Sequence, residues 1–121
     1  MINNLILVGR VADNPDFKNL DNGLKVCNLT LAVGRPFKDM TTGEYGTDFI
    51  KISLWSGIAQ ATYNYCNKGD IIGVKGRIAD RVKEVDGINN HYLEVIGERV
   101  VFIYLKKAKS PLSEKDSAVE K

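Results

Sequence analysis

Phe49, Lys51 and Trp55 are spaced so that one face of a predicted strand at residues 48–55 could bind a flat, charged ligand. Side chains alternate between the two faces of a strand, so these three point the same way as Ser53. The opposite face is wholly aliphatic, as a core would require, with Ile50, Ile52 and Leu54. Aromatic rings stack on bases and ammonium groups pair with phosphates, which predicts a single-stranded nucleic acid as the ligand. A core layer on both faces, or a contact between subunits, would also account for the aromatics.

Further aromatic and basic side chains lie where neighbouring elements could bring them to this face. Arg35 and Phe37 stand at the lip of a loop after Gly34. The predicted strand at 71–81 directs its basic residues away from the core and Ile72, Val74 and Ile78 inward. The candidate binding residues are therefore Arg35, Phe37, Phe49, Lys51, Trp55, Lys75, Arg77, Arg81 and Lys83. For each cation the alternative is an ordinary solvated surface charge, and for Trp55 it is a core position.

Side chains that could catalyse a reaction or hold a metal are sparse. His91 is the single histidine, and Cys27 and Cys66 occur in no CxxC or Cys/His spacing. No phosphate-binding loop, nucleophile elbow or HExxH pair is present. Carboxylates such as Asp21 and Asp86 belong to turn signals. We therefore expect no enzyme activity, no cofactor and no metal, and we expect both cysteines to be small buried hydrophobes.

Composition and charge are those of an ordinary soluble domain. The 121 residues are 44% hydrophobic and 26% charged, which suits one domain with one core. No apolar run approaches the roughly 20 residues of a membrane span, and the N-terminus lacks a secretory pattern, so a cytoplasmic location is expected. The formal net charge of +2 does not by itself mark a nucleic-acid binder. Binding would require the cations to gather on one face.

The predicted elements run strand, strand, strand, helix, strand, strand. Gly9 suggests a bulge or bend in the first strand, Ser56 is the expected N-cap of the helix, and Lys68-Gly69 is its expected stop. Residues 38–47 are expected to form a mobile loop. Because strands and helices do not alternate, a doubly wound parallel sheet is not expected. The order predicts a mainly β, five-stranded OB-fold Greek-key barrel with one helix between strands 3 and 4; a small α+β sheet is the alternative.

Several segments, in order and spacing, carry a family likeness that spans residues 1–105. They are Asn4–Val11 followed by Asp13–Pro15, Asn28–Val33, Asp48–Phe49 with Trp55, Tyr65–Asp70, and Val74–Ile78. Together they resemble the bacterial-type single-stranded DNA-binding protein family, although no single segment is diagnostic. The resemblance implies a protein that coats and protects single-stranded DNA with little sequence preference during DNA replication, recombination and repair. An OB-fold replication adaptor of primosomal type, acting through protein contacts, is the alternative function, and RNA binding is a third.

The resemblance also implies roles for individual residues. By position, Phe37, Phe49 and Trp55 match base-stacking aromatics, whereas Lys51 and Arg81 match phosphate-contacting cations. A homotetramer is implied, with a dimer as the alternative, and the apolar segment Leu5–Val8 would suit the pairing of first strands across subunits. Replication or recombination proteins are further implied partners.

Two features depart from the family pattern. A further stacking aromatic is common on the fourth strand near the Asp86-Gly87 turn, but Val82-Lys83-Glu84 supplies none. After a folded domain at 1–109, residues 110–121 are expected to be a short disordered tail. This tail closes in Lys121 instead of an acidic tip with a terminal apolar residue, so partners are not expected to dock there. A short member, such as a phage or plasmid encodes, with the host cytoplasm as its location, fits both departures.

Overall fold

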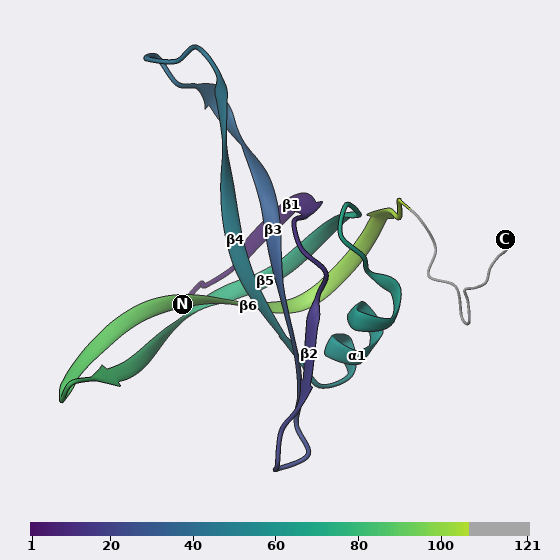
Figure 1. Cartoon of the computed structure of the whole chain (residues 1–121), viewed down its shortest axis with the longest axis vertical. Helices are drawn as coiled ribbons and strands as arrows, with labels where there is room; N and C mark the ends of the chain where they lie inside the picture. The colour runs from purple at the N-terminus through teal and green to yellow at the C-terminus, as the bar shows by residue number, and fades with distance from the viewer. Residues whose placement is uncertain (107–121) are drawn as a thin grey trace, which may run out of the picture.

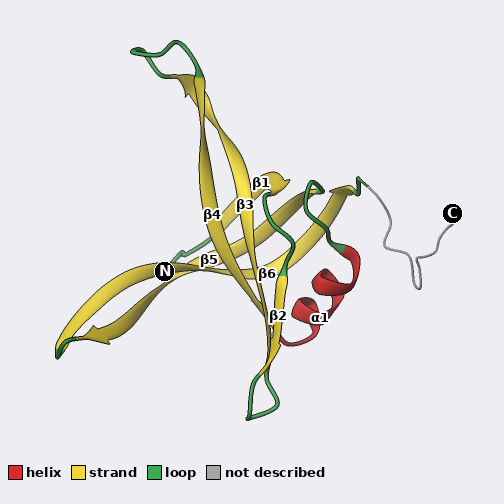
Figure 2. Ribbon diagram, viewed as in Figure 1, coloured by secondary structure: helices red, strands yellow, loops and turns green. Residues whose placement is uncertain are grey.

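The computed structural model describes residues 1–106, a mainly β chain with one helix (Figures 1 and 2). Its elements are β1 (Leu5–Val11), β2 (Asp16–Asn19), β3 (Lys25–Lys38), β4 (Tyr45–Trp55), α1 (Ser56–Tyr65), β5 (Ile71–Val85) and β6 (Ile88–Tyr104). The predicted fold class is confirmed, because five long strands form a barrel and α1 follows the third of them. β2 is an additional short strand that forms a hairpin with β3. The expected tail at 110–121 lies outside the described residues.

The barrel closes because β1 has a neighbour on each side. The strand order is β1-β5-β6-β4-β3, and β1 returns to β3 through the pairs Arg10↔Ala32 and Val11↔Leu31. The contact between β4 and β6 is parallel and short, whereas the other pairings are antiparallel. Two hairpins extend beyond this closure in different directions (Figure 1). We call them the β3–β4 arm (residues 34–47) and the β5–β6 arm (residues 78–95).

The core lies inside the barrel and follows the predicted alternation along β4. Ile52 and Leu54 are 1% and 0% exposed, whereas Phe49 on the opposite face is 66% exposed. The remaining core comes mainly from β3, β5 and one face of α1, with Leu29, Leu31, Ile72, Val74 and Ala59. Cys27 and Cys66 are buried as expected. No helix among residues 1–106 has the length and apolar character needed to cross a membrane.

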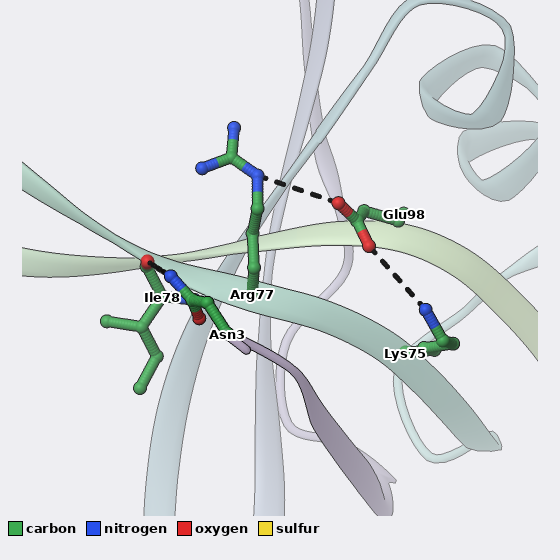
Figure 3. A network of polar contacts seen from close by, with 5 residues as sticks. All are labelled: Asn3, Lys75, Arg77, Ile78 and Glu98. Carbon is green, nitrogen blue, oxygen red and sulfur yellow. Dashed lines mark hydrogen bonds and ion pairs between the residues drawn. The ribbon is translucent and has the colours of Figure 1, made fainter. Parts of the chain in front are cut away.

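Ile78 was expected in the core, but it is 41% exposed. Its strand has already left the barrel, because β1 stops pairing with β5 at Leu5↔Gly76. At this point the Asn3 side chain takes the place of a strand: its Nδ2 donates to the Ile78 carbonyl (2.7 Å), and the Ile78 N–H donates to Asn3 Oδ1 (3.0 Å; Figure 3). The β5–β6 arm therefore begins at Ile78, beyond the covered core.

The expected loop at 38–47 is much shorter in the structure. β3 runs to Lys38 and β4 starts at Tyr45, and these two residues pair after a register shift that begins at Gly34. The connection of residues 39–44 is fixed by Asp39, whose Oδ1 accepts a hydrogen bond from the Thr41 N–H (2.7 Å). Such local side-chain bonds stabilise a tight turn, so the two strands can pair almost to the tip.

Two local predictions about the ends of the helix were wrong, and of the bulge or bend expected at Gly9 the bulge is absent. Ser56 is the first residue of α1, not its N-cap; the capping position is Trp55, without a side-chain hydrogen bond. The helix ends at Tyr65, before the predicted stop, and Gly69 instead donates its N–H to the Val11 carbonyl (2.8 Å). Gly9 forms no bulge, since β1 keeps its register with β5. It permits a close approach, because a Cβ there would lie 2.5 Å from the Ala32 carbonyl oxygen of β3.

Gly97 of β6 should be intolerant of any side chain. A Cβ at this position would lie 2.3 Å from Leu54 Cδ2 and 3.1 Å from Val74 Cγ1, both of which belong to fully buried residues. Overpacking of this kind typically costs about 1–3 kcal/mol, and we expect Gly97→Ala to lower the free energy of unfolding in urea by that amount. Gly57→Ala is the matched control, because a Cβ there would meet no atom within 4 Å apart from its chain neighbours and the backbone of its own helix. An equal loss in both variants would contradict the packing explanation.

Candidate nucleic-acid interface

The predicted binding strand presents its polar and aromatic face on the outside of the barrel. Residues paired across antiparallel strands share a face, and Phe49, Lys51 and Ser53 of β4 pair with Ala32, Thr30 and Asn28 of β3. Phe49 and Lys51 are exposed, and Trp55 is half-buried at the strand end. The alternation predicted from the sequence therefore places these side chains together on the outside of the barrel, on a surface that we call the outer face.

Strand register extends the outer face across four strands. Asn28 of β3 pairs with Ser53 of β4, Ser53 pairs with Ile96 of β6, and Ile96 pairs with Arg77 of β5. Further along the β5–β6 arm, Arg81 pairs with Tyr92 and Lys83 with Asn90 on this same face. The candidate residues from two separate predicted strands thus lie on one continuous surface.

Most of the predicted cations on this surface already have carboxylate partners. Glu98 lies between Lys75 and Arg77, at 3.8 Å and 3.5 Å from their nitrogens (Figure 3). Arg81 Nε lies 2.5 Å from Glu94 Oε1. Lys51 and Lys83 have no ion pair with another residue of the described segment 1–106. The prediction of these cations from sequence did not include their counter-ions.

The β3–β4 arm carries the remaining two candidates. Phe37 is 80% exposed near the tip of the arm. The Arg35 guanidinium donates from Nε to Asp48 Oδ1 (2.9 Å), and this hydrogen bond together with the charge of Asp48 raises the pKa of Arg35 above its ordinary value. Beside them a hollow of about 330 Å³ is lined by residues including Arg35, Phe37, Lys38 and Tyr45.

A larger groove of about 610 Å³ lies where the outer face meets the loop before β2. Its lining includes Asp13, Asn28, Lys51, Ser53, Tyr92 and Glu94. Burial alone would raise the pKa of the Glu94 carboxyl, but hydrogen bonds from Ser53 and Arg81 outweigh burial and hold this pKa below its ordinary value. The groove therefore combines an aromatic ring, an ammonium group and a fixed carboxylate.

Two aromatic residues of this surface were missed in the sequence. Tyr45 is 61% exposed and lies on the same face of β4 as Phe49, but the segment before Asp48 was interpreted as a loop. Tyr92 is 51% exposed and lies opposite Arg81. Counting outward from the Asp86-Gly87 turn would have revealed it, because that turn sets the partner of every residue on the arm. The β5–β6 arm thus carries an aromatic residue on β6, although Val82-Lys83-Glu84 on β5 has none.

The single histidine of the chain lies away from the outer face. His91 Nδ1 lies 3.0 Å from Asp80 Oδ2, on the face of the β5–β6 arm that is opposite to Arg81 and Tyr92. No group of three or more potential metal ligands occurs among residues 1–106. What the outer face offers is stacking, hydrogen bonding and charge.

Comparison with known proteins gives consistent matches over this whole body. A model of the family described as "Single-strand binding protein family" matches residues 2–103. "Single-stranded DNA-binding protein 1" of Clostridium acetobutylicum is 38% identical over 108 residues, covering 88% of this chain and 97% of that protein. "Single-stranded DNA-binding protein B" of Bacillus subtilis is 39% identical over 104 residues, covering 85% and 91%.

Solved structures are also similar. One titled "Plasmodium falciparum SSB complex with ssDNA" matches with a TM-score of 0.73 and 27% identity, covering 85% of this chain and 96% of that chain. The wild-type single-stranded DNA binding protein from Thermus aquaticus matches with a TM-score of 0.75, covering 87% of this chain and 52% of that chain. Its identity of 24% supports a shared fold alone.

Proposed function

Because this chain belongs to the single-strand binding protein family, we propose that it binds single-stranded DNA along the outer face. The observation that carries the proposal is the row from Arg77 through Ile96 and Ser53 to Asn28, which joins the aromatic and basic residues of four strands into one surface. The proposed role is to coat and protect DNA with little sequence preference during replication, recombination and repair. It is a binding role without catalysis or cofactor, exercised in the cytoplasm, where such DNA is exposed.

The aromatic residues would supply the part of the affinity that does not depend on sequence. Every base has a flat face, so stacking on a ring is tolerant of base identity and contributes about 1–3 kcal/mol per base. Phe37 and Phe49 are well exposed for this, and Trp55 offers a partly covered ring at the end of β4. The structure adds Tyr45 and Tyr92, so that stacking positions extend along both arms.

The cations would follow the phosphates. Lys51 and Lys83 lack ion-pair partners within residues 1–106 and are the most available. The side chains of Arg35, Lys75, Arg77 and Arg81 remain 44–57% exposed, so a phosphate can reach them by competing with their carboxylates. Binding would then release counterions and weaken with salt.

An apolar surface over β1 supports the proposal of a homotetramer, and it adjoins the outer face where Ile6 pairs with Lys75. Val8 of β1 pairs with Gly73 of β5, and Gly73 pairs with Val101 of β6. Because Gly73 has no side chain, Val8 and Ile103 close over it. We define the β1 patch as Ile6, Val8, Val101 and Ile103. These four side chains are 51–70% exposed in the isolated chain. Contiguous exposed apolar residues mark interaction sites, and we assign the β1 patch to self-association, with a dimer as the alternative.

The adaptor function remains the second candidate, and one observation favours it. Leu93, Val82 and Ile78 are 72%, 54% and 41% exposed, and they lie on the face of the β5–β6 arm away from Arg81 and Tyr92. An apolar strip on a projecting hairpin is suited to contact with another protein. This surface could recruit a replication or recombination protein without any acidic C-terminal tip.

We expect tight binding to oligo-dT and much weaker binding to duplex DNA of equal length. Stacking needs unpaired bases, which a duplex does not offer. Fluorescence anisotropy with labelled oligo-dT, a mixed-sequence single strand, duplex DNA and RNA at low salt measures both preferences. Absence of single-strand binding under these conditions would contradict the proposal and favour the adaptor function.

Removal of individual rings should weaken binding without unfolding the protein. We expect Phe49→Ala and Tyr92→Ala each to cost about 1–3 kcal/mol of affinity for oligo-dT, because each would lose one stacked base. Tyr65→Ala is the matched control: this tyrosine is 62% exposed but belongs to α1, where it contacts Phe102. Unchanged affinity in the first two variants, with thermal unfolding intact, would place the DNA elsewhere on the surface.

Charge in the β1 patch should dissociate the oligomer. Ile6→Glu would place a carboxylate in the proposed apolar contact, where its desolvation is unfavourable. We expect light scattering after size exclusion to show the mass of four chains for the unchanged protein and of fewer for this variant. Ile88→Glu, at an equally exposed apolar position near the tip of the β5–β6 arm, should leave the mass unchanged. A monomeric unchanged protein would overturn the assignment.

A further inference from the structure

Arg81 and Glu94 form the closest ion pair of the outer face. The Arg81 Nε lies 2.5 Å from Glu94 Oε1, and the Glu94 side chain is only 18% exposed, whereas its partner is 44% exposed. The other carboxylates that hold cations of this surface, Asp48 and Glu98, are 47% and 45% exposed. Glu94 is therefore the most fixed of these negative charges.

Glu94 also lies on the proposed DNA path. It lines the 610 Å³ groove together with Lys51 and Tyr92, and Asp13 and Asp16 line the same groove. Hydrogen bonds from Ser53 and Arg81 outweigh the effect of burial and lower the pKa of Glu94, so its carboxylate stays charged at neutral pH. A DNA strand that enters this groove meets the negative charge of Glu94 close to Lys51, one of the cations proposed to bind its phosphates.

Two roles are possible for a carboxylate in this position. It could hold the Arg81 guanidinium in the orientation that a phosphate requires, and would then strengthen binding. It could instead occupy the guanidinium and repel the phosphate, and would then weaken binding. A phosphate that reaches the terminal nitrogens of Arg81 comes within a few ångströms of the Glu94 carboxylate, because both groups contact the same planar cation. Like charges at that distance in a partly desolvated groove repel each other strongly.

We propose that Glu94 is a competitor of the DNA phosphate for Arg81, and that it limits the affinity of this site for single-stranded DNA. This inference rests on the proposed function. In the free protein Arg81 is paired with Glu94, and on binding it exchanges this partner for a phosphate. Glu98, between Lys75 and Arg77, does the same in a more exposed position (Figure 3). Because Glu94 takes Arg81 back when the phosphate leaves, the exchange helps other proteins to displace this protein from DNA.

The test is Glu94→Gln, which keeps the size and one acceptor oxygen but removes the charge. Oligo-dT affinity is measured by fluorescence anisotropy between about 50 and 200 mM NaCl. We expect tighter binding, by several-fold at the lowest salt, and a salt slope steeper by about 0.7, because the site then presents one more uncompensated positive charge to the phosphates. The gain should then shrink by about 2.6-fold across this fourfold range of salt. Glu98→Gln should act in the same direction.

Asp80→Asn is the matched control. It changes the net charge equally and lies on the same arm, but Asp80 is on the face away from Arg81 and is paired with His91. It should leave the salt slope unchanged. Weaker binding with a shallower slope in Glu94→Gln, at an unchanged melting temperature, would show that Glu94 positions Arg81 instead. If Asp80→Asn raised the oligo-dT affinity as much as Glu94→Gln does, the change in net charge alone would explain the effect, and the inference would also be overturned. If the unchanged chain binds no oligo-dT, the proposed function itself fails.

Discussion

The arrangement of β4 between two partners is the constraint on which the rest of this structure depends. β4 pairs with β3 along nearly its whole length and with β6 at three positions, so it cannot rotate or slip. A shift by one residue would move Ile52 and Leu54 from the core to solvent. Burial of these two side chains therefore fixes the opposite face as well, and this places Phe49, Lys51 and Trp55 on the outside together.

The barrel holds the packed core that stabilises the protein, whereas the two arms carry exposed side chains suited to binding. Gly9 lets β1 approach the β3 backbone, and Gly97 leaves room for the core side chains of Leu54 and Val74. Before β5, the buried Asp70 accepts hydrogen bonds from the Asn67 and Lys106 N–H groups (2.7 and 2.8 Å). The arms have no such core, and their residues are mostly exposed. They are free to carry aromatic and charged side chains, because no packing requirement limits their composition.

Sequence alone predicted those features that depend on a single strand. The alternation in β4, the burial of both cysteines and the order of the long elements all follow from local periodicity. Cross-strand relations do not follow from the periodicity of one strand: Tyr92 meets Arg81 because the turn at Asp86-Gly87 sets the register between β5 and β6. Ile78 was predicted in the core because its pattern matches Val74, but β1 ends before it and leaves it uncovered. The carboxylate partners of the arginines were missed for the same reason, since Glu94 is thirteen residues from Arg81.

The central claim is that single-stranded DNA lies on the outer face and not on the β1 patch or beside α1. Photo-crosslinking of bromodeoxyuridine-substituted oligo-dT, with the crosslinked residues identified by mass spectrometry, tests it most directly. The account predicts crosslinks at aromatic residues of the outer face and its arms, with Phe49 and Tyr92 among them. Crosslinks confined to Tyr65, Phe102 or the residues of the β1 patch would contradict it.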